Sequence, residues 1–176
     1  MKINSYILCI FLISVFFSGP VVPKGLTKRI TVESHQTGSQ MEITDPVIVQ
    51  NFSIYQGPST IYENGIAAGT RPYNDRGAFI DWSGGRLSSI PDGLSHYTIR
   101  FYLADLRNGE EMKRNYTVRY AFTPAEKSGY IYLPMPFEKG YRNGMMYHGE
   151  EFEGHWYYST DPWERLVRPE ISKNGL

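Results

Sequence analysis

The fold of this chain is decided by two segments, YTIRFYL at residues 97–103 and YTVRYAF at residues 116–122. In both, a bulky side chain alternates with a polar or smaller one, beginning at Tyr97 and at Tyr116. Successive side chains of a β-strand point to opposite faces of a sheet, so the pattern predicts two strands, each with one face toward the core. The dipeptide Asn108-Gly109 between them favours a hairpin turn, which predicts that the two strands pair in antiparallel fashion.

Further strand signals lie on both sides of this pair. YIYL at residues 130–133 predicts a third strand, and weaker signals lie at residues 47–55, 79–82 and 152–158. Glycine and proline recur between the segments, which is typical of several short strands joined by turns.

One helix is predicted near the carboxyl end. Asp161 is a suitable N-cap, Pro162 suits the first helical position and Glu164 favours the first turn. Pro169 is expected to end this helix at about Arg168. The fold class predicted is therefore mainly β: a single antiparallel sandwich or open barrel with one short C-terminal helix.

Three short motifs in this half of the chain resemble those of a group of short uncharacterised bacterial proteins. The motifs are YIYLP at residues 130–134, EGHWY at residues 153–157 and Trp163-Glu164. The group combines a YLP strand, an EGxW segment and a terminal W-[DE] helix, and the resemblance extends from about Phe79 to the end. It has no assigned activity, so the resemblance implies a shared domain and no function.

The amino-terminal residues have the layout of an export signal. Lys2 precedes an uncharged apolar run from Ile7 to Phe17, and Gly19-Pro20 follows. We therefore interpret residues 1–23 as a signal peptide or membrane anchor.

Two outcomes stay open for this segment. Phe16 and Phe17 stand where a small residue is preferred before a cleavage site, and residues 3–23 contain no charge, so they are able to anchor the chain. We expect an extracytoplasmic location, periplasmic or secreted, with membrane contact only through this segment. Residues 24–45 are polar and predict a linker, which leaves residues 46–176 as the β-rich domain.

Composition excludes some functions. The chain has 18 basic and 18 acidic residues, so it offers no basic field for nucleic acid. Cys9 is the single cysteine, which leaves the exported part without disulfides or a thiolate nucleophile. Phosphate-binding loops, dinucleotide fingerprints and zinc-protease motifs are missing from the sequence. We predict no cofactor, no metal site and no catalytic residue; one enzymatic alternative is a hydrolase using Glu151 and Glu153 on one strand face.

Aromatic residues make up 15% of the chain, and this predicts rings at the surface. The alternation places five candidate binding residues on the non-core face: Arg100, Tyr102, Arg119, Tyr130 and Tyr132. Such rings and guanidinium groups are able to stack on sugar faces or to hold a protein. Trp82, before a glycine-rich loop, is a further candidate. The competing interpretations are cross-strand stabilisation for the array and core packing for Trp82.

The leading hypothesis is a non-catalytic binding or interaction module of the cell envelope, with a glycan or an envelope protein as partner. The alternatives are a membrane-tethered structural or accessory subunit and a carboxylate-dependent hydrolase.

Overall fold

A computed structural model describes residues 26–54, 59–63, 66–71, 78–104, 108–141, 143, 147 and 151–176. The predicted signal or anchor at residues 1–23 lies outside the described residues. In the part that the structure does describe, helices long and apolar enough to cross a membrane do not occur.

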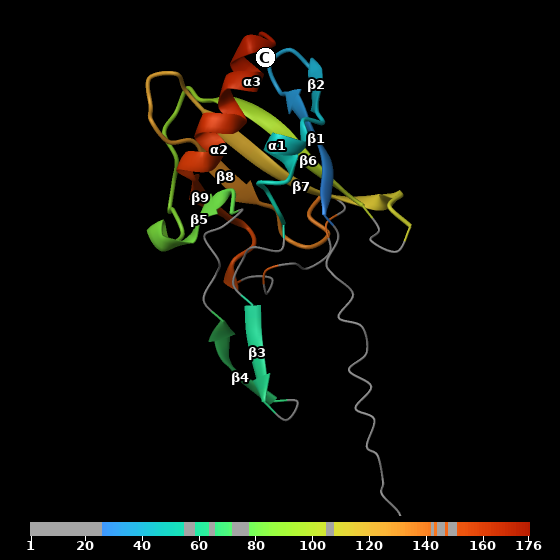
Figure 1. The fold of residues 1–176 in the computed structure, drawn as a ribbon. Helices are drawn as coiled ribbons and strands as arrows, with labels where there is room; N and C mark the ends of the chain where they lie inside the picture. The colour runs from blue at the N-terminus through green and yellow to red at the C-terminus, as the bar shows by residue number, and fades with distance from the viewer. Residues whose placement is uncertain are drawn as a thin grey trace, which may run out of the picture.

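The domain is built on one antiparallel sheet of seven strands in the order β2-β1-β6-β7-β8-β9-β5 (Figure 1). The strands are β1 Thr27–Ser34, β2 Gln40–Ile43, β5 Ile80–Asp81, β6 Ser95–Ala104, β7 Glu111–Phe122, β8 Tyr130–Leu133 and β9 His155–Ser159. A separate two-stranded sheet pairs β3 Ser59–Glu63 with β4 Ile66–Arg71. The sheet does not close into a barrel, and the predicted mainly-β class is confirmed.

The central pair β6 and β7 has the predicted antiparallel pairing and alternation. Ile99 lies opposite Val118 and Tyr97 lies opposite Tyr120 in an antiparallel ladder. The side chains of one face are buried, including Ile99 and Val118 at 0% exposure. The periodicity of the two opening segments therefore identified both the strands and the side that faces the core.

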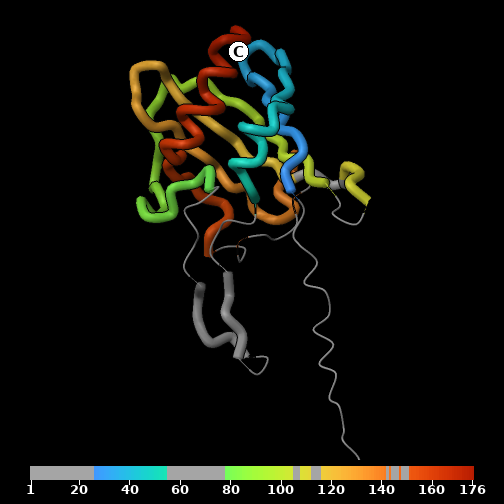
Figure 2. The backbone as a smooth tube through the Cα atoms, in the orientation of Figure 1, coloured from blue at the N-terminus to red at the C-terminus, as the bar shows by residue number. Residues whose placement is uncertain are grey.

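Helices cover one face of the sheet, which we call the inner face (Figures 1 and 2). They are α1 Pro46–Val49, α2 Asp161–Leu166 and α3 Arg168–Lys173, and a short 3₁₀ turn, η1 Trp82–Gly84, follows β5. Trp163 of α2 is fully buried, with its ring centroid 4.9 Å from that of Phe52 and 6.0 Å from that of Phe101. The core thus fills the space between these helices and the inner face.

The predicted linker at residues 24–45 is wrong from Thr27 onward. β1 pairs with both β2 and the central strand β6, and its Ile30 and Val32 are completely buried. The polar composition belongs to the other face of this strand, where Arg29 and Glu33 form ion pairs across the sheet. A strand with one charged face and one buried face is typical of an antiparallel sheet.

Two helical regions also differ from prediction. Residues 46–49 form α1 where a strand was expected, because the Asp45 side chain accepts a hydrogen bond from the Val47 amide at 2.8 Å and Pro46 fits the first turn. Pro169 does not end the C-terminal helical segment. It occupies the first turn of α3, where a missing amide hydrogen has no cost to the helix.

The carboxylate of Glu164 joins the C-terminal helices to the sheet, and we call this set of contacts the Glu164 junction. Oε1 accepts hydrogen bonds from the Tyr120 hydroxyl at 2.9 Å, the Gly129 amide at 3.1 Å and the Ser159 hydroxyl. Arg168 of α3 forms an ion pair with Oε2. Burial, followed by the nearby Glu164 charge, raises the pKa of Tyr120 well above its usual range, so its hydroxyl stays protonated as a donor.

Replacement of Gly129 by alanine is expected to destabilise the fold by about 1–3 kcal/mol, because the junction leaves no room for a methyl group. A Cβ there would lie 2.5 Å from Cε2 of Tyr120 and 2.9 Å from Oε1 of Glu164. Urea unfolding followed by circular dichroism measures the loss. The matched control is Gly84→Ala, where the nearest atom is 3.2 Å away on the exposed Tyr158 ring, and a change of about 0.5 kcal/mol or less is expected. Equal effects of the two variants would contradict the role given to the junction.

Candidate binding site on the outer face of the sheet

The face opposite the helices, which we call the outer face, carries one continuous row of cross-strand neighbours. Glu33 of β1 lies opposite Thr98 of β6, Thr98 opposite Arg119 of β7, Arg119 opposite Tyr132 of β8, and Tyr132 opposite Trp156 of β9. Each step is one strand spacing of about 4.8 Å. We call these five residues the outer row; all of them are partly accessible to solvent.

Neighbouring segments cover the outer face on one side of this row. Leu87, Ile90 and Leu94 pack against Tyr130 and against partly buried Trp156. Tyr130 is consequently only 7% exposed, and its hydroxyl donates to Glu126 at 2.7 Å. The outer row is therefore partly open to a ligand, as is a hollow on the same face that is lined by Arg29, Thr31, Arg100 and Tyr102.

Arg119 lies close to both rings of the row. Its guanidinium carbon lies 5.5 Å from the Trp156 ring centroid and 6.0 Å from that of Tyr132. The two ring centroids are 5.2 Å apart, with their planes inclined at 46°. Cations at such distances are attracted by aromatic rings, so the contacts fix the guanidinium in place without neutralising it.

The three arginines of this face differ in their acidic partners. Arg29 pairs with Glu111 at 2.6 Å and Glu42 at 3.0 Å, and Arg100 pairs with Glu33 at 2.7 Å. Among the described residues, no carboxylate lies within ion-pair distance of Arg119. Its Nε is shielded from solvent and has no hydrogen-bond acceptor in the described part of the chain.

Two histidines lie beside the row. The rings of His35 and His96 stack with centroids 6.3 Å apart, and His96 meets the edge of Trp156 at 6.2 Å. His35 Nε2 is 2.8 Å from the Thr98 hydroxyl. Burial, followed by the charge of Arg119, lowers the pKa of both imidazoles below the usual 6.5, so both are neutral at pH 7.

The phenol of Tyr132 is tied to the segment after β8. Its hydroxyl donates to Glu138 at 3.1 Å, and the same carboxylate oxygen accepts the Met135 amide at 2.9 Å. Burial and the Glu138 charge raise the pKa of Tyr132 to about 12. The ring is thereby held in one orientation beside Arg119.

The predicted binding residues divide into four groups. Arg119 and Tyr132 belong to the outer row; Arg100 and Tyr102 lie on the same face but are engaged, Tyr102 beneath the Arg29 guanidinium at 3.5 Å. Tyr130 is covered as described above. Trp82 is 9% exposed and packs in the core against three other rings, those of Tyr147, Phe152 and Tyr157.

Sequence reasoning missed three residues of the site: Trp156, His35 and His96. The alternation in HWYYS at residues 155–159 was a usable signal for Trp156, since Tyr157 faces the core and its neighbours face outward. His35 follows a strand that was read as a linker. Nothing local marks His96, because its position depends on the pairing of β1 with β6.

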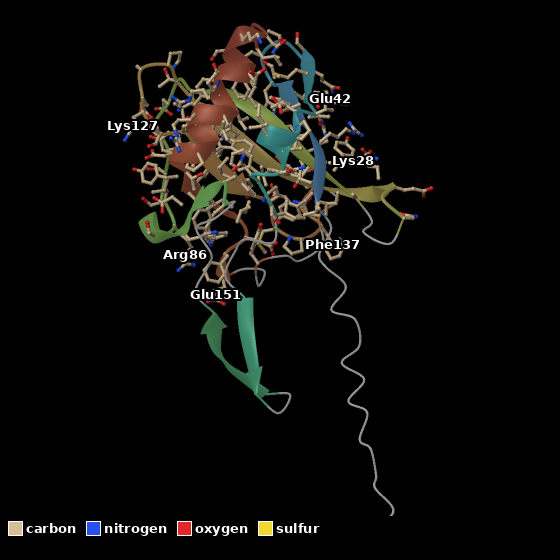
Figure 3. The ribbon with its side chains drawn as sticks, in the orientation of Figure 1. Lys28, Glu42, Arg86, Lys127, Phe137 and Glu151 are labelled. Atoms are coloured by element: carbon tan, nitrogen blue, oxygen red, sulfur yellow. The ribbon has the colours of Figure 1, made fainter. Side chains whose placement is uncertain are left out.

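The carboxylate pair proposed for hydrolysis does not form. Residues 151–154 precede β9, and β9 begins at His155, so Glu151 and Glu153 do not share a strand face. Glu153 is 1% exposed and accepts from the Tyr116 hydroxyl at 3.3 Å, whereas Glu151 is exposed near Arg86 at one end of the domain (Figure 3). One carboxylate is inside the protein and the other is in water, so the predicted acid–base geometry is wrong.

A cavity of about 640 Å³ lies at the β5–β9 edge of the sheet. It is lined by Asp81, Asp161 and Tyr158, by small polar residues, and by the apolar residues Ala78, Ile80 and Pro162. The Tyr158 ring is 38% exposed and lies 5.5 Å, centroid to centroid, from Tyr130. The hydroxyl groups and carboxylates of this cavity are of the kind that bind sugar hydroxyls. Among its described lining residues, Tyr158 alone offers an aromatic ring.

The chemistry of the outer row is recognition by stacking, hydrogen bonding and charge. Within the described residues, groups of three metal-type ligands are not found. Comparisons of the chain with protein-family models, curated proteins and solved structures gave no match. The geometry of the outer row is therefore the basis on which a function can be proposed.

Histidine titrations test the electrostatics of this site. Arg119→Gln is expected to raise the pKa of both His35 and His96, because the Arg119 charge lowers both, whereas Arg100→Gln is expected to raise only that of His35. Proton-detected ¹⁵N NMR of the imidazoles measures the midpoints. Arg165→Gln, on the exposed side of α2, is the control.

The same pKa shifts give the sign of a pH effect on stability. The folded protein holds the two imidazoles neutral, while in the unfolded chain they bind protons near pH 6.5. The contribution of the two histidines to the free energy of unfolding is therefore fully present above pH 6.5 and is lost as the pH falls through the folded pKa values. In Arg119→Gln the free energy of unfolding should fall less as the pH is lowered below 6.5. An identical pH dependence of the unfolding free energy in Arg119→Gln and the parent protein would argue against an effect of the Arg119 charge on the histidines.

Proposed function

We propose that this protein is a non-catalytic, glycan-binding module of the cell envelope and that the outer row is its binding site. The observation that carries the proposal is the packing of Trp156, Tyr132 and Arg119 side by side on one accessible sheet face. Two rings and a guanidinium held at fixed spacing offer flat apolar surfaces and donors together, which is what sugar rings require of a protein.

Polar groups beside the rings support a glycan. Thr98 and the two neutral imidazoles of His35 and His96 lie next to Arg119, and they are able to donate to or accept from sugar hydroxyls. The rings are held by neighbours and lose little freedom when a ligand binds.

A protein partner is less well supported by the same face. Stable protein interfaces have a core of clustered apolar side chains. The exposed large apolar residues of the described chain are scattered over different elements: Leu26, Val47, Phe137 and Tyr158. The outer row is polar at its centre, so we favour a glycan and treat a protein partner as an outcome of the test.

An envelope location belongs to this proposal through the first 23 residues. The basic start, the apolar run and the Gly19-Pro20 break favour export, with the domain either released or tethered. A tethered structural subunit is the alternative, and it requires no ligand at the outer row.

Binding of a glycan panel, measured by array and then by isothermal titration calorimetry, tests the proposal. Trp156→Ala is expected to weaken the best glycan about tenfold, because one stacking contact is lost. Tyr158→Ala, in the neighbouring cavity, should change affinity less than threefold, and Val47→Ala on α1 should not change it.

Two results would contradict the proposal. One is a larger loss in Tyr158→Ala than in Trp156→Ala, which would assign the ligand to the β5–β9 cavity. The other is the binding of no glycan alongside Trp156-dependent capture of an envelope protein. Circular dichroism of each variant confirms that the fold is retained.

A further inference from the structure

We infer that Arg119 is the anion-binding position of the outer row and that it takes a single carboxylate or sulfate group carried by the glycan. This inference rests on the proposed function and adds the charge of the ligand to it. It is carried by the difference between Arg119 and the other two arginines of the same face, whose charges are already neutralised.

Arg119 is a partly buried cation that the described residues leave without an anion. Its Nε is out of contact with solvent and makes no hydrogen bond with them. A buried donor without an acceptor raises the free energy of the unliganded protein, and a charged one does so more strongly. Because Arg119 as a residue is partly accessible, an oxyanion that reaches its guanidinium supplies the missing charge and an oxygen acceptor.

The described groups nearest to Arg119 do not neutralise its charge. Cation–π contacts with Trp156 and Tyr132 attract the guanidinium but offer no oxygen acceptor. Glu33 is the acidic member of the row, but it is bound to Arg100 at 2.7 Å. Glu138 is occupied by the Tyr132 hydroxyl and the Met135 amide.

The groups that face Arg119 come from four strands and one following segment. From β1 come Glu33 and the adjoining His35; from β6 come His96, Thr98 and Arg100; from β8 and β9 come Tyr132 and Trp156; and from the segment after β8 come Glu138 and Tyr141. The imidazoles are neutral at pH 7, and Glu33 offsets Arg100. Glu138 repels an anion, but it is bound at the Tyr132 hydroxyl, so Arg119 is, among the described arginines of this face, the one left available to an anionic ligand.

The histidines beside Arg119 report on an anion without any assay of glycan binding. The Arg119 charge disfavours their protonation, and an anion seated on the guanidinium opposes that effect. Binding of an anion and protonation of the imidazoles are therefore coupled, and each favours the other. The affinity of an acidic ligand is expected to rise as the pH falls from 7 toward 6.

The first experiment adds sodium sulfate to the full-length protein and follows the imidazole titrations by NMR, with sodium chloride at equal ionic strength as reference. Sulfate is expected to raise the midpoints of His35 and His96 by about half a unit or more in the parent protein and to leave them unchanged in Arg119→Gln. No rise in the parent protein, or an equal rise in both proteins, would overturn the inference.

The second experiment compares a galacturonate trimer with a neutral galactose trimer of the same linkage by calorimetry. The acidic trimer is expected to bind more tightly and to lose at least tenfold in Arg119→Gln, because charge-assisted hydrogen bonds are removed. A sulfated galactose trimer is expected to behave like the galacturonate. Arg165→Gln, on the exposed side of α2 and away from the outer row, is the control, with a change below threefold.

The two proposals fail in different ways. Equal binding of acidic and neutral trimers, weakened by Trp156→Ala and unaffected by Arg119→Gln, would overturn the anion position and support glycan binding. A sulfate effect at the histidines together with no binding of any glycan would support the anion position and contradict the glycan. Circular dichroism and urea unfolding of Arg119→Gln show that a loss is not caused by unfolding.

Discussion

The buried carboxylate of Glu164 accepts hydrogen bonds from β7, from the residue before β8 and from β9, and it is neutralised by Arg168. A carboxylate in such a position is costly unless its oxygens are satisfied and its charge is paired. Here both conditions are met by groups from separate parts of the chain. The docking of α2 and α3 over the inner face, with Trp163 in the core, depends on this set of contacts.

The outer face follows from that docking. Because α1, α2 and α3 all pack on the inner face, the core is closed on one side and the sheet needs no second layer for its buried strands. Most of the outer side chains then satisfy one another: Arg29 with Glu111 and Glu42, and Arg100 with Glu33. Arg119 is the exception among these three arginines, so it is the position at which this face is expected to meet a charged ligand.

Local periodicity was sufficient to predict β6, β7 and β8, because their alternation is written in adjacent residues. The C-terminal helix begins at Asp161, but the predicted cap is wrong: the N-cap is Thr160, whose side chain accepts a hydrogen bond from the Trp163 amide. It failed for β1, whose charged face reads as a linker until the pairing with β6 is known. Trp82 was a candidate ligand contact and is a core residue; a ring before a glycine-rich loop carries no sign of which side it packs on. The outer row joins residues from five strands between positions 33 and 156, so spacing in the sequence was unable to predict it as a whole.

The segments YIYLP, EGHWY and Trp163-Glu164 have structural roles in this domain. Glu164 holds the helices, Glu153 is buried against Tyr116, and the Gly154 amide donates to the Leu133 carbonyl at 2.6 Å with a backbone φ of 84° that glycine adopts readily. Trp156 is different, because its ring is turned to the outer row although its backbone continues the same strand. One short segment thus fixes the sheet through Glu153 and Gly154 and presents a ring to the outer row through Trp156, so it contributes to the core and to the accessible face together.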